Sequence, residues 1–487
     1  MLTRILIIVL VLILEGCSVL QPPVLTQIPL AAPLPPLCKD ENATVTSDEL
    51  LLPQESENDF PQTIKKVNDL IHFPQDISLY AEHNALNQEN IYEIQQQFDG
   101  HYYRPWAYTV APICANEAAW PIRAFKGGYG SNLKPYDPSW FTEMEEQSNF
   151  QAFSTLNKSA LTTKWMSLRV FPTSKPLYKN PSAPGDGYPF DLLQNSSVAF
   201  NEPIFLSHMS KDGAWSYIFT NNASGWVETN NIVTLTTDQI EILKGKEKLF
   251  ITEDRTPLRD SENRFVAYSR IGMVLPFMSE NNESYKALSV DTSGKIKELL
   301  IPKSSAHIGI RLLNKEDLTK IGTHLLRNTY GWGGMFEERD CSSMIRDYLT
   351  PFGIWLPRNS AQQAKKGEVI SFQDLNNTQK IALIKEQGVP FETILYKKGH
   401  VLLYVGTYED TVMVMHNIWG IRTKDKAGLT GRVIVGRAII STLELGADVE
   451  NFDSDNMLLN TLVSMNIFTK APIPIAQKKE KGKLSKL

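Results

Sequence analysis

The sequence is poor in cysteine, in long apolar runs and in excess positive charge, and each shortage excludes a class of protein. Its 487 residues include four cysteines and no Cys-x-x-Cys pair, which excludes a disulfide scaffold and a cysteine zinc site. Lys and Arg number 49 against 54 Asp and Glu, so no basic field exists to hold a nucleic acid. No His-Glu-x-x-His pattern occurs, and we expect neither a metal site nor a cofactor.

One apolar run stands at the amino terminus. Residues 5–14 are apolar without a break, which is the length of a signal-peptide core and too short to span a bilayer. The motif Leu14-Glu15-Gly16-Cys17 follows and resembles the lipobox of bacterial lipoproteins. This implies removal of residues 1–16 and lipidation of Cys17; an uncleaved anchor or a chance cysteine is the alternative. Ser18 resembles the sorting signal for the outer membrane, so we expect a protein anchored there, in a Gram-negative bacterium, facing the periplasm.

Residues 17–57 are rich in proline and then acidic, which predicts an extended tether. Outside the cytoplasm disulfides persist, so Cys38 and Cys114 can pair with each other. The alternative is two independent buried thiols. Either arrangement leaves Cys341 unpaired.

The rest of the chain divides into four regions and a tail. A mixed, partly helical domain is expected first, then two small all-β barrels, then an α+β domain with helices before strands, and last a C-terminal segment with a basic end. Their ranges are 58–165, 168–237, 249–305, 308–445 and 446–487. The chain is therefore expected to be a multidomain protein.

The two barrel regions share a faint internal similarity. Lys175-Pro176-Leu177-Tyr178 in the first matches Thr256-Pro257-Leu258-Arg259 in the second, which suggests a repeat. Both regions resemble bacterial SH3-like barrels. In the first, the resemblance rests on residues 190–196 and on Ser224-Gly225-Trp226-Val227.

The last region carries the residues that suggest chemistry. Helices are predicted over 315–326 and 341–352, and Cys341 opens the second, where the unpaired N–H groups of a helix start favour a thiolate. A cysteine nucleophile needs a base, and His400 and His416 lie downstream on two strands that a hairpin would bring together. This combination predicts a papain-like arrangement.

Five short motifs in this order resemble the NlpC-type cell-wall peptidases. They are Tyr330-Gly331-Trp332-Gly333-Gly334, Asp340-Cys341-Ser342, Leu356-Pro357-Arg358-Asn359-Ser360, Gly399-His400-Val401 and His416. The similarity covers residues 308–445, and SH3-like domains accompany one subfamily of these enzymes. It implies that Cys341 is the nucleophile, His400 the general base and His416 the residue that orients it.

The resemblance also implies a substrate and its contacts. Tyr330 would lie beside the scissile carbonyl, and Asp340 and Ser342 would bind the free amino end of a peptidoglycan stem peptide. Trp332 and Ser360 would line the pocket. The expected reaction is hydrolysis of the bond between γ-D-glutamate and a diamino acid such as diaminopimelate, with a preference for peptides that begin with a free L-alanine.

Three departures from the family pattern concern substrate preference. Ser343 replaces the usual glycine after Asp-Cys-Ser, Leu402 replaces a glycine after His-Val, and a helix near residues 374–386 is inserted. A simpler role for Asp340 is to cap the N-terminus of the helix, and it can fill this role together with the amine contact. The alternatives for the whole protein are an inactive wall-binding scaffold, or an amidase or acyltransferase on the same fold. We expect a monomer, with stem peptides and a membrane as partners.

Overall fold

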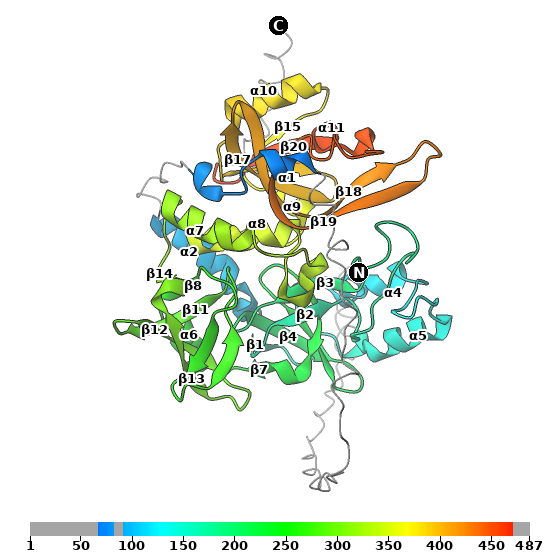
Figure 1. Cartoon of the computed structure of the whole chain (residues 1–487). Coiled ribbons are helices and arrows are strands. Elements are labelled where there is room, and N and C mark those ends of the chain that lie inside the picture. The colour runs from blue at the N-terminus through cyan, green and yellow to red at the C-terminus, as the bar shows by residue number, and fades with distance from the viewer. Residues whose placement is uncertain (1–66, 82–90, 471–487) are drawn as a thin grey trace, which may run out of the picture. The chain divides into compact units, whose positions relative to one another are not determined.

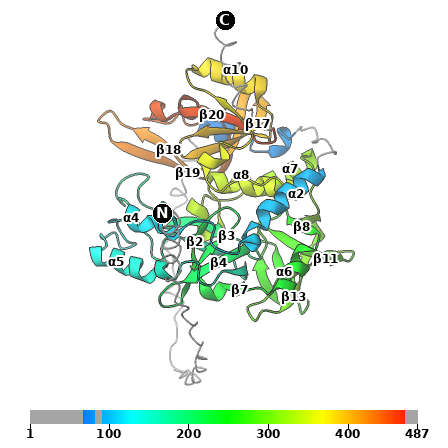
Figure 2. The ribbon, with the colours of Figure 1, turned by 180° about the vertical axis from the view of Figure 1, so that it is seen from behind.

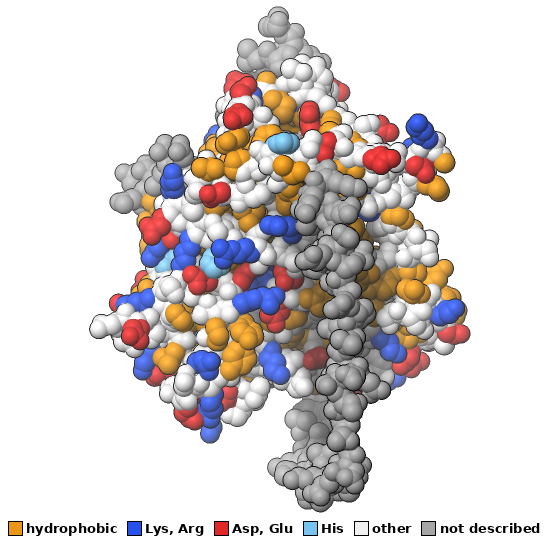
Figure 3. Space-filling model, in the orientation of Figure 1, with side chains coloured by type: hydrophobic (Ala, Val, Ile, Leu, Met, Phe, Trp, Pro, Cys, Tyr) orange, Lys and Arg blue, Asp and Glu red, His pale blue; other side chains and the backbone are white. Residues whose placement is uncertain are grey.

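The computed structural model describes residues 67–81 and 91–470, which contain three antiparallel sheets and the helices around them (Figure 1). The multidomain fold class is confirmed. Basic and acidic side chains are interspersed on the face drawn in Figure 3. Among the described helices, none has the length and apolar composition to cross a bilayer.

The first sheet has seven strands in the order β3-β2-β6-β5-β4-β1-β7. Their bounds are β1 Lys158–Thr162, β2 Met166–Arg169, β3 Gln194–Val198, β4 Pro203–Met209, β5 Trp215–Phe219, β6 Ser224–Glu228 and β7 Ile232–Thr234. The sheet is open rather than a closed barrel. It also begins ten residues before the predicted boundary at 168, because the short strand β1 pairs with both β4 and β7 and buries Ala160 and Leu161.

The second sheet has the order β10-β9-β13-β12-β11-β8-β14. Its strands are β8 Lys248–Ile251, β9 Pro257–Asp260, β10 Phe265–Tyr268, β11 Val274–Glu280, β12 Ser284–Val290, β13 Ile296–Pro302 and β14 Ala306–Ile308. Strand for strand this is the order of the first sheet, so the predicted repeat is confirmed. The short sequence match does not align with it, however: Leu258 lies in β9, whereas Leu177 lies in the connection between β2 and β3.

The third sheet has six strands in the order β15-β20-β16-β17-β18-β19. The strands are β15 Glu368–Ser371, β16 Thr393–Lys397, β17 His400–Tyr408, β18 Thr411–Lys424, β19 Thr430–Thr442 and β20 Leu462–Ile467. Strands β18 and β19 extend past their neighbours as a two-stranded ribbon that is visible from both sides (Figures 1 and 2).

Strand β20 corrects the predicted domain boundary at 445. The segment 446–487 was expected to lie outside the α+β domain, yet β20 pairs with both β15 and β16 inside its sheet. Met465 and Ile467 are fully buried there. β20 is only six residues long and comes shortly before the basic tail, so its short run of apolar residues is a weak signal for a strand.

Helices of the third domain flank this sheet: α7 Lys315–Leu325, α8 Cys341–Leu349, α9 Ser360–Gln363, α10 Asn377–Gln387 and α11 Leu458–Thr461. Helix α8 buries almost every one of its residues, and Met344, Ile345 and Tyr348 pack with α7 and with Val401 and Leu403 of β17. This shared core fixes the start of α8 against β17. Helix α10 accounts for the inserted helix predicted near 374–386.

The described parts of the N-terminal region pack onto the other domains rather than around a core of their own. The helices are α1 Asn68–His72, α2 Ile91–Tyr102, α3 Ala115–Ala118, α4 Trp120–Ala124 and α5 Pro138–Gln147; α6 Thr237–Lys244 joins the first two sheets. Asp69 accepts a hydrogen bond from the backbone of Thr442 in β19 at 2.6 Å. Phe98 of α2 packs against Phe250 of β8 with the two rings tilted, and Trp140 of α5 packs on Phe171 beside the first sheet. The N-terminal region therefore contacts all three sheet domains.

Candidate active site

Cys341 is the first residue of α8, and Asp340 before it is the N-cap. The Asp340 carboxylate accepts from the backbone N–H of Ser343 at 2.9 Å, and the Ser343 hydroxyl accepts from the backbone N–H of Asp340 at 2.9 Å. This reciprocal pair is a capping box. Ser343, the departure from the family's glycine, is buried and completes the cap.

The Cys341 thiol is 7% exposed, and its environment favours the protonated form. Burial first, and then the neighbouring Asp340 charge, raise the pKa of Cys341 to about 12; the backbone N–H groups of Val401 and Ser342 act in the opposite direction. The sequence argument from the helix start, which favoured a thiolate, is therefore outweighed by burial. The thiol needs a base at the moment of reaction.

His400 and His416 lie side by side on β17 and β18, as the hairpin predicted. His400 Nε2 is 2.9 Å from His416 Nδ1, and His416 Nε2 is 3.0 Å from the Ser441 hydroxyl on β19. Ser441 donates to the backbone carbonyl of Thr442, so it accepts from His416. His416 Nδ1 then accepts from His400 Nε2–H, which leaves His400 Nδ1 with a free lone pair.

Both imidazoles are neutral in this arrangement. Burial, followed by the charge of Lys397, lowers the pKa of His400 to about 3, and burial and His400 lower the pKa of His416. Val401, the residue after His400, presents its N–H to the Cys341 thiol. His400, neutral and unprotonated at Nδ1, is thus adjacent in sequence to Val401, whose N–H contacts the Cys341 thiol. A thiol and a neutral imidazole are the resting partners of general-base catalysis.

Arg358 joins Asp340 to Ser342, and sequence reasoning gave this arginine no role. Its guanidinium bonds the Asp340 carboxylate at 2.6 Å and 3.2 Å and the Ser342 hydroxyl at 2.9 Å, and its Nε donates to Ser196 of β3 at 2.8 Å. Burial alone would raise the pKa of Asp340, but the Arg358 charge outweighs it and lowers the pKa. The only sequence signal for this role was the position of Arg358 inside a motif of the family.

Aromatic side chains from two domains border the site. Tyr330 packs on Trp419 of β18 at 5.9 Å between ring centroids, and Phe190 of the first barrel region packs on both Trp419 and Trp332. The Trp332 indole donates to the backbone carbonyl of Asp191 at 2.9 Å. Trp332 therefore ties the third domain to the first sheet.

Ser360 opens α9, and among the described contacts its side chain has no hydrogen bond to the site residues. Its pocket-lining role stays a prediction. Cys114 is exposed, and its thiol has no disulfide partner within the described residues. Cys17 and Cys38 lie outside those residues, so the Cys38–Cys114 disulfide stays a prediction. No group of three or more His, Cys, Asp or Glu side chains within the described ranges is arranged to hold a metal ion.

A buried ionic network holds the segment that leads into α8. Arg339 is fully buried, and its guanidinium bonds Asp254 of the second barrel region at 2.6 Å and 2.8 Å and Asp347 of α8 at 2.8 Å. Arg270, which precedes β11, also pairs with Asp347. The second sheet region thereby fixes the chain two residues before Cys341.

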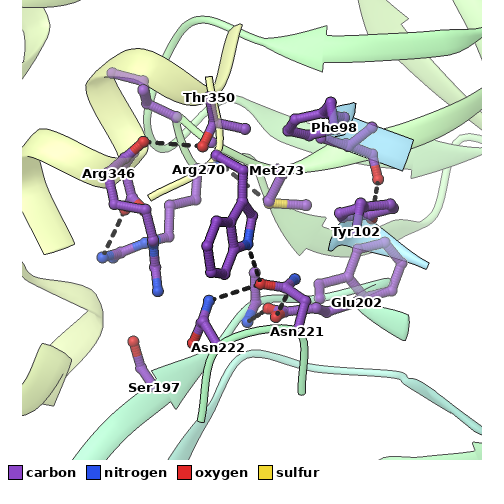
Figure 4. A pocket seen from close by; sticks show the side chains of 17 residues that line it. Phe98, Tyr102, Ser197, Glu202, Asn221, Asn222, Arg270, Met273, Arg346 and Thr350 are labelled. Atoms are coloured by element: carbon purple, nitrogen blue, oxygen red, sulfur yellow. Dashed lines mark hydrogen bonds and ion pairs between the residues drawn. The ribbon is translucent and has the colours of Figure 1, made fainter. Parts of the chain in front are cut away.

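A pocket beside this network lies where α2, the first two sheets and α8 meet (Figure 4). Glu202, which immediately precedes β4, accepts from the Asn221 amide at 3.4 Å, and the Asn221 side-chain oxygen accepts from the Trp355 indole at 3.1 Å. Arg346 of α8 reaches the same pocket and pairs with Asp347. Burial raises the pKa of Glu202 to about 7, although the charge of Arg346 opposes this.

Comparison with known proteins identifies the parts. The model of the NlpC/P60 family matches residues 327–425, which hold Cys341, His400 and His416. Residues 327–425 therefore form an NlpC/P60-type domain. SH3 domain models of the SH3b1 and SH3b2 types match residues 176–228 and 238–281, and the NLPC_P60 stabilising domain matches residues 6–153. The expected family and its accompanying SH3-like domains are confirmed, and the NlpC/P60 domain makes this protein a cysteine peptidase of the cell-wall hydrolase type.

One solved structure agrees with this over most of the chain. An NlpC/P60 endopeptidase from Photobacterium damselae subsp. piscicida is 25% identical, with 82% of this chain and 98% of that chain covered at a TM-score of 0.73. An NlpC/P60 family protein from Bacillus cereus is 16% identical, with 64% of this chain and 99% of that chain covered at a TM-score of 0.42. No curated protein matches this sequence.

Proposed function

We propose that this NlpC/P60 protein hydrolyses the bond between γ-D-glutamate and diaminopimelate in peptidoglycan stem peptides. The observation that carries the proposal is the relay from His400 through His416 to Ser441, which leaves His400 Nδ1 unprotonated next to the residue that contacts the Cys341 thiol. A base oriented by a second imidazole is what a buried thiol requires.

The steps follow from these positions. His400 Nδ1 takes the thiol proton of Cys341 as the sulfur attacks the γ-carbonyl carbon, and the backbone N–H of Cys341 stabilises the oxyanion. The C–N bond breaks, and His400 gives its proton to the leaving amine. Water then attacks the acyl-enzyme, passes its proton to His400 and releases the new carboxylate, and the thiol regains its proton.

We propose that the free amino end of the peptide binds at Asp340 and Ser342. Oδ1 of Asp340 already faces Ser342, Ser343 and Arg358, whereas the described partner of Oδ2 is Arg358 at 2.6 Å. An ammonium group would therefore approach Oδ2 and the Ser342 hydroxyl. Acetylation of the L-alanine amine would remove both contacts and its charge, so a free peptide should be cut faster than its acetylated form.

The test is mass spectrometry of products from defined muropeptides. The tripeptide L-Ala-γ-D-Glu-diaminopimelate should yield L-Ala-D-Glu and diaminopimelate, and Cys341→Ala should lower the rate by at least about 10³-fold. Cys114→Ala, which changes an exposed and free thiol, is the matched control and should cut normally. Release of an intact peptide from the glycan would indicate an amidase, a transferred peptide an acyltransferase, and binding without any product a scaffold.

We also propose that Cys17 carries a lipid that anchors the protein to the outer membrane, on the periplasmic side. The support is the apolar run followed by Leu14-Glu15-Gly16-Cys17 and Ser18. Cell fractionation would test this: the wild-type chain should sediment with outer membranes, and Cys17→Ala should abolish labelling by a fatty acid. Persistence of label in that variant would contradict the proposal.

A further inference from the structure

A pocket next to the catalytic residues has His400 in its wall, together with a group of cationic side chains. Lys397, Arg422 and Arg432 line it, whereas Asp340, Ser342 and Arg358 do not. Because His400 must protonate the leaving amine in the proposed mechanism, the leaving group has to lie beside His400. The pocket is therefore a candidate for the leaving-group side, because His400 lines it and the proposed amine-binding residues do not.

The pocket contains more positive than negative charge. Arg422 and Arg432 are direct cross-strand partners on β18 and β19, an arrangement of like charges that destabilises a sheet. Arg422 Nε bonds Asp453 at 3.1 Å, and within the described residues neither Lys397 nor Arg432 makes an ion pair. Burial, and then the charges of Arg432 and Arg422, lower the pKa of Lys397. An anionic ligand group would relieve this repulsion.

The remaining lining indicates what carries the anion. Apolar side chains form part of the wall, and the cavity has a volume of about 250 Å³, room for several water molecules at about 30 Å³ each. These side chains are Phe190, Ile418, Ile421, Leu445, Phe452 and Leu458. The Asp453 carboxylate, which Arg422 bonds at 3.1 Å and Asn456 at 2.7 Å, does not itself line the pocket, so it offsets only the charge of Arg422. Methylene groups that end in a carboxylate match the combination of an apolar wall and unpaired cations.

We propose that this pocket binds the side chain of the diamino acid and selects one that ends in an amino-acid group, as in diaminopimelate, over one that ends in an amine alone, as in lysine. The carboxylate would lie between Lys397 and Arg432, and the methylenes would lie on the apolar wall. A lysine side chain would bring a bare ammonium to a cationic site. The inference rests on the proposed function, because it assumes cleavage at this bond.

The experiment compares three synthetic tripeptides that differ only in the third residue: diaminopimelate, its side-chain carboxamide, and L-lysine. The diaminopimelate peptide should have a kcat/KM about tenfold or more above either of the others, because only it offers the charge-assisted hydrogen bonds. Arg432→Gln should bring the three values close together, mainly by raising KM for diaminopimelate. Arg432→Lys, which keeps the charge, should restore part of the preference.

Lys424→Gln is the control for this experiment, because Lys424 is an exposed cation on the same strand as Arg422 and does not line the pocket. It should keep the wild-type ratio. Equal cleavage of all three peptides by the wild type would overturn the inference and leave the proposed function intact. No cleavage at this bond in any peptide would refute the proposed function instead. The carboxamide comparison uses only wild-type protein, so it decides the question even if Arg432→Gln does not fold.

Discussion

The first and second sheets have one strand order but serve the NlpC/P60 domain in different ways. The first sheet and its β2–β3 connection contact residues near the proposed amine-binding site: Ser196 accepts from Arg358, and the Asp191 carbonyl accepts from Trp332. The second reaches the segment before the nucleophile, where Asp254 holds Arg339. One copy of the repeated unit thus contacts Arg358 and Trp332, and the other contacts Arg339 just before α8. Substitutions in the first region should therefore lower kcat/KM, whereas substitutions in the second should mainly lower the free energy of unfolding.

The largest effect is expected from the second sheet. Asp254→Ala would leave the fully buried Arg339 without the bidentate partner that faces it at 2.6 Å and 2.8 Å. Asp347 would remain as a partner, but it is shared with Arg270 and Arg346. Removal of one partner from a buried ion pair costs about 3–5 kcal/mol. Chemical denaturation of the purified protein should show a loss of unfolding free energy of this size, with kcat reduced because the start of α8 loses its support.

Arg255→Gln is the control for that loss. Arg255 is adjacent in sequence and pairs with Glu338, but its side chain is 67% exposed. An exposed ion pair contributes about 1 kcal/mol at most. If the two variants lost equal stability, the buried network would not be what fixes α8.

The first sheet should give a smaller effect, on catalysis. Ser196→Ala removes the acceptor for Arg358 Nε and leaves the contacts of the guanidinium with Asp340 and Ser342 less well oriented. One hydrogen bond to a charged group is worth about 1.5 kcal/mol, or about tenfold, which should appear in kcat/KM for the free tripeptide. Asn195→Ala, an exposed neighbour on the same strand, is the control. A loss for both variants alike would mean that the strand matters rather than the Arg358 contact.

Local features of the NlpC/P60 domain could be read from the sequence. Helix α7 spans Lys315–Leu325 against a predicted 315–326, and α8 begins at Cys341 as expected. These follow from helical periodicity and from Asp340 as a cap. His400 and His416 come together because a hairpin of adjacent strands joins them, which is also a local relation.

The features that the sequence did not reveal depend on distant partners. Arg339 pairs with Asp254, 85 positions away, and Arg358 reaches Ser196, 162 positions away. Hydrophobic periodicity reports local structure only, so it cannot reveal contacts between residues this far apart in sequence. The same reason explains the error about the Cys341 thiol, since the burial that raises its pKa comes from the surrounding domain and not from the helix start.

The smallest predicted effect concerns Glu202, in the pocket where the first two sheets meet α8 (Figure 4). The folded-state pKa of Glu202 is about 7, against an ordinary value of 4.5, so the folded protein holds this proton more tightly than the unfolded chain does. Unfolding free energy should therefore fall as pH rises from about 4.5 to about 7, and the full loss should persist above that.

Glu202→Gln keeps the shape of the side chain but cannot ionise. It should match the wild type in stability near pH 4 and exceed it by about 1 kcal/mol at pH 8, with partial solvent exposure keeping the gain below the value for a dry site. Denaturation curves at the two pH values measure this directly. Glu202 immediately precedes β4 and shares its pocket with Arg346 of α8. A gain in stability without a change in kcat/KM would show that the ionised carboxylate is unfavourable in this pocket and takes no part in catalysis. An equal gain at both pH values would mean that ionisation of Glu202 is not the cause.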